Sequence, residues 1–72
     1  MSLQWTKAGD RCVTSGDYTV TRFNSLGGRD CYVAYRRAEA IIEPQFFVRE
    51  NAGERKAAYD ACIHACELHA EG

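Results

Sequence analysis

The sequence predicts a small α+β domain, in which an antiparallel three-stranded β-meander packs against one C-terminal α-helix. Residues 17–24 and 31–37 alternate polar and apolar positions and are rich in β-branched and aromatic side chains, which is typical of half-buried strands. Between them lies the pair Gly27-Gly28, which can adopt the positive φ angles of a hairpin turn. Residues 52–70 are rich in alanine and contain no proline, which favours a helix of about 18 residues. Because the strands precede the helix, we expect the helix to cover one face of the sheet.

Two features lie before this hairpin. Residues 10–15 favour a third strand, because the Ser-Gly-Asp sequence at 15–17 is a compact turn signal that separates them from the next strand. Trp5 precedes this strand, and we expect such a large side chain near the start of a small domain to close one end of the core.

The segment between the hairpin and the helix has a mixed pattern. Ile41 and Ile42 could extend a strand, but Pro44 interrupts regular pairing. Residues 46–48 then form a short apolar run before the helix. We therefore predict three strands in all and assign none to residues 45–48.

The helix has a clear start signal and two distinct sides. Asn51 and Glu54 match an N-cap and its capping-box partner, since the Asn side chain can accept a free backbone N–H while Glu54 reaches back. At about 100° per residue, small and apolar side chains gather on one side and charged ones on the other. The expected inner side holds Ala58, Ala61, Cys62, Ala65, Cys66, Leu68 and His69, and the outer side holds Lys56, Asp60, His64, Glu67 and Glu71.

Length and composition limit the possible functions. A chain of 72 residues forms one domain, and 46% hydrophobic residues are enough for it to fold. The net charge of −1 argues against a strongly basic nucleic-acid binder. No apolar run approaches the roughly 18 residues of a membrane span, and no signal pattern is seen, so we expect a cytoplasmic protein that does not bind membranes. Residues 1–3 and 71–72 match the ends that expression vectors leave around an insert.

The four cysteines allow three interpretations. Without a secretion signal we expect free thiols, and Cys12 with Cys31 is the pair to test for a disulfide. Cys62, Cys66 and His69 are spaced i, i+4 and i+7, so they share one helical face and could bind zinc with a fourth ligand from the sheet. The same spacing is what an amphipathic helix produces, and cysteine is commonly buried, so core packing is the favoured interpretation. We expect no cofactor.

The sheet provides the candidate binding surface. If the helix covers Tyr18 and Val20 on one strand with Val33 and Tyr35 on the next, the opposite face is left open. That face would hold Thr19, Thr21, Phe23, Tyr32, Ala34 and Arg36. It could be a solvated face, the contact of a homodimer or of another protein, or a surface that stacks nucleic-acid bases. The hypothetical binding set is Arg22, Phe23, Arg29, Tyr32, Arg36 and Arg37. A slip of one residue in register would exchange the two faces.

The chain also resembles a group of known proteins. Trp5, the strand at 16–22, the Tyr-Val-Ala-Tyr strand at 32–35 and the late helix with cysteine and His69 resemble small hypothetical proteins of phages and prophages. The resemblance spans most of the chain, although the segment 38–50 is longer here. These proteins share no assigned activity, so the resemblance implies no site residue. The order of strands and helix is also similar to small DNA-binding domains of some phage integrases and plant transcription factors, which grip DNA through the sheet.

Together these observations predict a non-enzymatic accessory protein of phage or prophage type that binds a macromolecule. No Ser-His-Asp order, phosphate-binding loop or carboxylate pair is present to support catalysis. We expect a homodimer that forms through a sheet edge or the open face. The alternatives are a nucleic-acid-binding module that uses the open face, and a zinc or thiol site on the helix.

Overall fold

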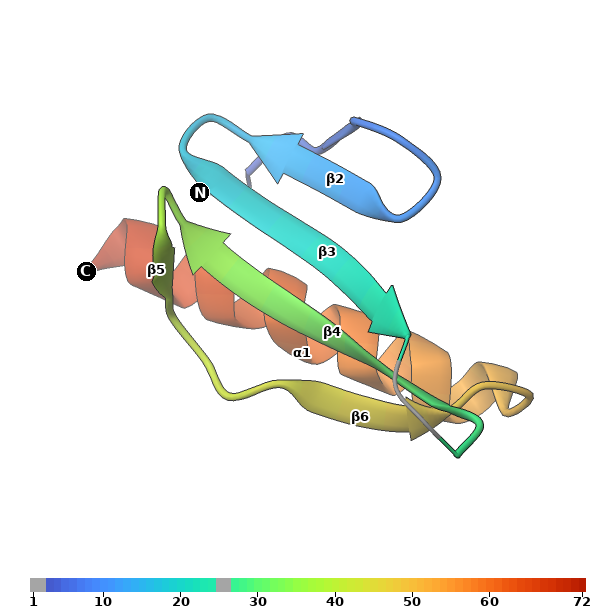
Figure 1. Cartoon of the computed structure of the whole chain (residues 1–72). Coiled ribbons are helices and arrows are strands. Elements are labelled where there is room, and N and C mark those ends of the chain that lie inside the picture. Colours follow the sequence, from blue (N-terminus) through green and yellow to red (C-terminus); the bar gives the residue numbers. More distant parts are fainter. Residues whose placement is uncertain (1–2, 25–26) are drawn as a thin grey trace.

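The computed structural model describes residues 3–24 and 27–72. Within these residues the chain forms one antiparallel sheet and one C-terminal helix, which confirms the predicted α+β class (Figure 1). The elements are β1 (Thr6–Lys7), β2 (Cys12–Ser15), β3 (Tyr18–Asn24), β4 (Arg29–Arg36), β5 (Glu39–Ala40), β6 (Gln45–Val48) and α1 (Ala52–Glu71).

The central hairpin is formed by β3 and β4, as predicted. Its register runs from Tyr18 opposite Arg36 to Asn24 opposite Asp30 without interruption. Gly27 and Gly28 follow in the turn with φ angles of 83° and 77°, a region that glycine enters at little steric cost. The remainder of the predicted turn, residues 25–26, lies outside the described residues, as do residues 1–2 of the expected vector sequence. The predicted strand at 10–15 is β2, which pairs with β3.

The predicted number of three strands was wrong, because six strands form within the described residues. β1 and β5 are two-residue pairings at the ends of β2 and β4. The important addition is β6, which pairs with the first half of β4 directly after Pro44. A proline at the entrance of an edge strand removes no hydrogen bond that the strand needs, so it limits the strand's length and does not prevent pairing.

A buried ion pair joins β4 to the end of β6. The Asp30 side chain is 3% exposed, and its Oδ1 accepts from Arg49 Nε at 3.1 Å and from Arg49 Nη2 at 3.0 Å. Asp30 lies opposite Phe47 in the strand pairing, and Arg49 directly follows the last residue of β6. The sequence separates these charges by 19 positions, so no local pattern indicates the contact.

The helix begins at the predicted cap and runs one residue further than predicted. The backbone N–H of Glu54 donates to Asn51 Oδ1 at 3.0 Å, which satisfies one free donor of the first turn. The Glu54 carboxylate accepts in return from the Asn51 side-chain amide at 2.8 Å, in place of the backbone N–H that a capping box uses. The cap residue and its partner were therefore correctly predicted.

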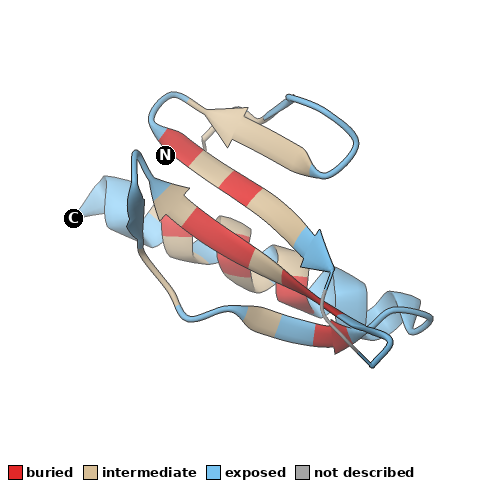
Figure 2. Cartoon of the chain, viewed as in Figure 1, coloured by how far each residue is buried: buried red, intermediate tan, exposed pale blue. Residues whose placement is uncertain are grey.

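The core lies between the helix and one face of the sheet (Figure 2). Its central cluster consists of Tyr18, Val20, Ala34, Cys62 and Cys66, and partly buried apolar side chains surround it. These side chains are Leu3, Trp5, Val13, Tyr32, Ile41, Ile42, Tyr59 and Ile63. The small residues of the helix allow it to approach the sheet closely, while aromatic side chains supply the volume.

The predicted inner side of the helix needs two corrections. Leu68 and His69 were expected on the buried side, but both are exposed, Leu68 at 55%. Leu68 follows Cys62 by six positions, which corresponds to a rotation of about 120° away from that fully buried residue. Tyr59 and Ile63 pack against the core instead. Within the described residues, the helix is not apolar enough over a sufficient length to cross a bilayer.

Candidate functional site

The two faces of the sheet are assigned by the register of the hairpin. Val20 lies opposite Ala34, and Arg22 lies opposite Tyr32, so these side chains share the face that packs against α1. The ring of Tyr32 stacks on Phe47 at a centroid distance of 5.3 Å and meets the ring of Tyr59 edge-on at 5.4 Å. Tyr32 therefore lies under the helix.

This register overturns the predicted faces of the second strand. Tyr32, Ala34 and Arg36 were expected on the open face, but they lie on the helix side, and Val33 with Tyr35 take their place. The faces predicted for Tyr18 and Val20 are correct. The cause is a one-residue difference in pairing, which exchanges every side chain of a strand between the two faces.

The side of the sheet away from the helix carries an exposed apolar surface, which we call the uncovered face. By register it consists of Cys12, Thr14, Thr19, Thr21, Phe23, Arg29, Cys31, Val33, Tyr35, Phe46 and Val48. Phe23, Cys31 and Phe46 form one row across three strands. Phe23 is 47% exposed, Phe46 is 59% exposed and Val48 is 42% exposed, whereas Cys31 and Val33 on the same face are buried. Large apolar side chains clustered on one face are characteristic of contact surfaces.

The structure does not bring the predicted binding residues together on one surface. Phe23 and Arg29 lie on the uncovered face, whereas Arg22, Tyr32 and Arg36 lie on the helix side. Arg37 follows β4 with a φ of 58° and places its Nε 3.4 Å from a carboxylate oxygen of Asp17. The predicted combination of aromatic rings and arginines is thus divided between two faces and a turn.

The stripe on the helix packs into the core. Cys62 and Cys66 are 0% exposed, and burial raises the pKa of each thiol to about 11, with a smaller contribution from Cys66 to the pKa of Cys62. Both thiols are protonated at neutral pH and pack as small apolar side chains. His69 lies further along the helix, where its Nδ1 is 2.9 Å from the hydroxyl of Tyr18. The described residues contain no group of three or more potential metal ligands.

The pair proposed for a disulfide is held apart by a strand. All four cysteines are free thiols. Cys12 lies on β2 and Cys31 lies on β4, with β3 hydrogen-bonded between them. Two strand spacings amount to about 9–10 Å, which exceeds the Cα separation of about 7 Å that a disulfide can bridge.

The outer edge of β6 is poorly suited to adding another strand. The N–H of Arg49 donates to the C=O of Gly28, and along an antiparallel strand every second residue bonds to the same neighbour. The backbone N–H and C=O groups of Phe46 and Val48 therefore point away from β4. The N–H of Val48 lies 3.4 Å from Glu54 Oε1, and its carbonyl accepts from Asn51 N–H at 2.9 Å. The N-terminal turn of the helix thereby occupies the Val48 end of this edge.

Among the large exposed apolar side chains of the uncovered face, sequence reasoning missed Phe46 and Val48. The sequence pattern that could have indicated them is the alternation of β6, which is only four residues long and directly follows Pro44. Phe46 is exposed while the adjacent Phe47 is 2% exposed, so what the sequence presents as one apolar run is an alternating strand. The long β4 strand, which begins at Arg29, supplies the partner that makes this strand possible.

Comparisons with known proteins give no further assignment. No protein-family model, curated protein or solved structure matches the chain.

Proposed function

We propose that this chain is a non-enzymatic accessory protein that acts by binding a macromolecule, and that it forms a homodimer through the uncovered face. The observation that carries the proposal is the exposure of Phe23, Phe46 and Val48 on a face that the single helix does not reach. Burying such side chains against a partner stabilises association by about 25 cal/mol for each Å² of apolar surface removed from water.

The composition of the uncovered face supports a second copy of the chain as the partner. Its side chains are threonine, valine, cysteine, phenylalanine and tyrosine, with Arg29 as the single charged residue at one end. Two such faces can meet around a two-fold axis without placing like charges in the centre. The contacts at the Val48 end of β6 favour pairing between faces over pairing through this edge. A domain of 72 residues also gains from the extra buried surface.

Sedimentation equilibrium over a range of concentrations tests the proposal. The wild-type chain should approach the mass of a dimer, and Phe46→Glu should remain a monomer because it buries a charge in the contact. Leu68→Glu is the matched control, since Leu68 is equally exposed but lies on the helix. A wild-type chain that stays monomeric at the highest soluble concentration would refute the dimer, as would loss of the dimer in both variants.

Nucleic-acid binding is the second candidate, and the two exposed rings of Phe23 and Phe46 favour it because bases stack on such side chains. Arg22 and Arg36 lie on the other side of the sheet, so this candidate ranks behind the dimer. Titration of single-stranded oligonucleotides at low and high salt tests it. Binding that weakens with salt and is lost in Phe23→Ala supports it, whereas no binding at low salt rejects it.

A further inference from the structure

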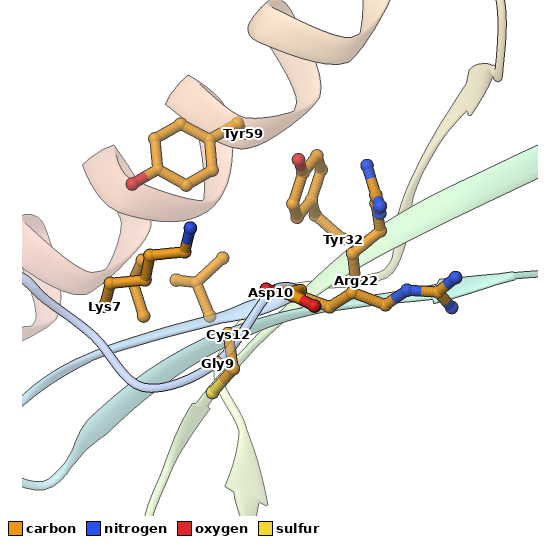
Figure 3. Close-up of a pocket in the computed structure, with 10 residues that line it drawn as sticks. Lys7, Gly9, Asp10, Cys12, Arg22, Tyr32 and Tyr59 are labelled. Carbon is orange, nitrogen blue, oxygen red and sulfur yellow. The ribbon is translucent and has the colours of Figure 1, made fainter.

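A groove on the helix side of the sheet lies apart from the exposed rings of the uncovered face and shares only Cys12 with that face. The helix contacts β3, β4 and β6, and β2 lies beyond it (Figure 1). Between β2 and the helix lies a groove of about 170 Å³ (Figure 3). Its apolar lining comes from Val13, Val20, Tyr32 and Tyr59. The rings of the two tyrosines meet edge-on at 68°, and the contact of Tyr32 with Phe47 holds this corner in place.

The polar lining of the groove is predominantly cationic. Lys7, Arg11 and Arg22 contribute three positive charges, and Asp10 contributes one negative charge. None of the three cationic side chains forms an ion pair with another residue in the part of the chain that the structure describes. Lys7, Asp10 and Arg11 are exposed, so the groove opens to solvent at this end. Excess positive charge beside an apolar wall favours an anion that also has an apolar part.

Arg22 gives the clearest sign that a partner from outside the chain is needed. Its Nε is buried and has no hydrogen-bond partner among the described residues, although buried donors in proteins are nearly always paired. Arg22 lies on β3 opposite Tyr32, and both residues line the groove. A guanidinium in such a place can hold a carboxylate through two parallel hydrogen bonds.

We propose that this groove binds a small aromatic carboxylate, with its ring against Tyr32 and Tyr59 and its carboxylate on Arg22. The volume of the groove, 170 Å³, is close to the roughly 150 Å³ of a protein cavity known to accept benzene. Tyr59 remains a neutral hydrogen-bond donor, because burial raises the pKa of its hydroxyl above the usual value. Lys7 and Arg11 at the open end add long-range attraction for the anion.

The site does not depend on the proposed dimer. Tyr32, Arg22 and Val20 lie on the helix side of the sheet, whereas Phe23 and Phe46 lie on the other side. A variant that disrupts the dimer, such as Phe46→Glu, should therefore bind the ligand as the wild-type chain does.

Titration of the full chain with benzoate, followed by amide chemical shifts, tests the proposal. Benzoate should bind saturably in the millimolar range that a ligand of this size can reach, with the largest shifts at Val13, Arg22 and Tyr59. Benzyl alcohol, which keeps the ring and loses the charge, should bind at least about ten-fold more weakly, because the charge-assisted hydrogen bonds are lost. Acetate, which lacks the ring, should not saturate.

Variants distinguish recognition by the groove from general attraction of an anion. Arg22→Met should weaken benzoate binding about ten-fold or more, and Lys7→Met at the exposed end should weaken it by a smaller factor. Arg36→Met is the matched control and should leave binding unchanged, because Arg36 lies on the same side of the sheet but opposite Tyr18, at the other end of β3.

If Arg22→Met does not give a folded spectrum, Lys7→Met and the comparison of the three ligands still decide the result. Equal binding of benzoate and benzyl alcohol, or no saturable binding of benzoate, would overturn the proposal.

Discussion

The two faces of this sheet have similar apolar side chains and different surroundings. Phe46 and Phe47 are neighbours on β6, yet one is 59% exposed and the other is 2% exposed. Phe47 lies under the helix and stacks on Tyr32, while Phe46 lies in a row with Phe23 and Cys31 on the uncovered face. Both faces are apolar enough to be buried, and the chain has one helix to cover them. The covered face thus accounts for folding, and we propose that the uncovered face serves association.

The largest expected difference is between the two phenylalanines themselves. Phe47→Ala should lower the free energy of unfolding by about 3–5 kcal/mol, because it removes a fully buried ring and leaves a cavity. The adjacent Phe46→Ala should lower it by less than about 1 kcal/mol in dilute monomer, since the ring is already in water. Denaturant unfolding of both variants at low protein concentration measures the two values.

This comparison can fail in a clear way. Equal losses of stability in Phe46→Ala and Phe47→Ala would mean that the uncovered face already takes part in folding the monomer. If Phe47→Ala does not fold, Phe47→Leu provides a milder test, for which the expected loss is about 1–2 kcal/mol.

The second largest effect is expected at alkaline pH, which should lower the free energy of unfolding through the two buried thiols of the covered face. Burial raises the pKa of Cys62 and Cys66 from 9.0 to about 11, so the unfolded chain releases these protons at lower pH than the folded chain does. The stabilisation is complete below pH 9 and is lost as the pH rises from 9 to about 11, at about 2 kcal/mol for each thiol.

Unfolding free energies measured from pH 8 to pH 11 test this expectation. The variant with both Cys62→Ala and Cys66→Ala should be less stable at pH 8 but should lose less stability on the way to pH 11. Parallel curves for the two proteins would show that the buried thiols do not cause the alkaline loss.

A smaller effect is expected at the start of the helix that covers the sheet. Asn51→Ala removes the cap that accepts from Glu54 N–H at 3.0 Å, so stability should fall by about 1 kcal/mol. Lys56→Ala, which removes only the exposed contact between Lys56 and Asp60, should cost less than about 0.5 kcal/mol. Thermal unfolding of the two variants shows which one loses more stability. If Asn51→Ala is as stable as Lys56→Ala, the expected role of the cap is contradicted.

Sequence reasoning succeeded where the pattern is local. The β3–β4 hairpin, the β2 strand and the Asn51 cap follow from alternation, turn glycines and capping chemistry, each of which acts within a few residues. It failed for β6 and for the faces of β4, because both depend on which residues pair across the sheet. Register is decided by packing against the helix and by contacts such as that of Asp30 with Arg49, which join distant positions.

The candidate sites show the same limit. The sequence indicated that an exposed apolar sheet face would exist and included Phe23 in it, but Phe46 and Val48 came from a strand that only the pairing with β4 reveals. The groove beside Arg22 could not be predicted, because it arises where the helix covers β4 and β6 and leaves β2 uncovered. The lateral position of a helix on a sheet is a property of the whole packed core.

We propose that two copies of the chain meet on the uncovered face. Nuclear Overhauser effects between copies, in a mixture of isotope-labelled and unlabelled chain at high concentration, measure this directly. We expect contacts between copies from the rings of Phe23 and Phe46 to exposed side chains of the uncovered face such as Val48. Contacts between copies that involve α1 in place of these residues, or no contacts at all, would contradict it.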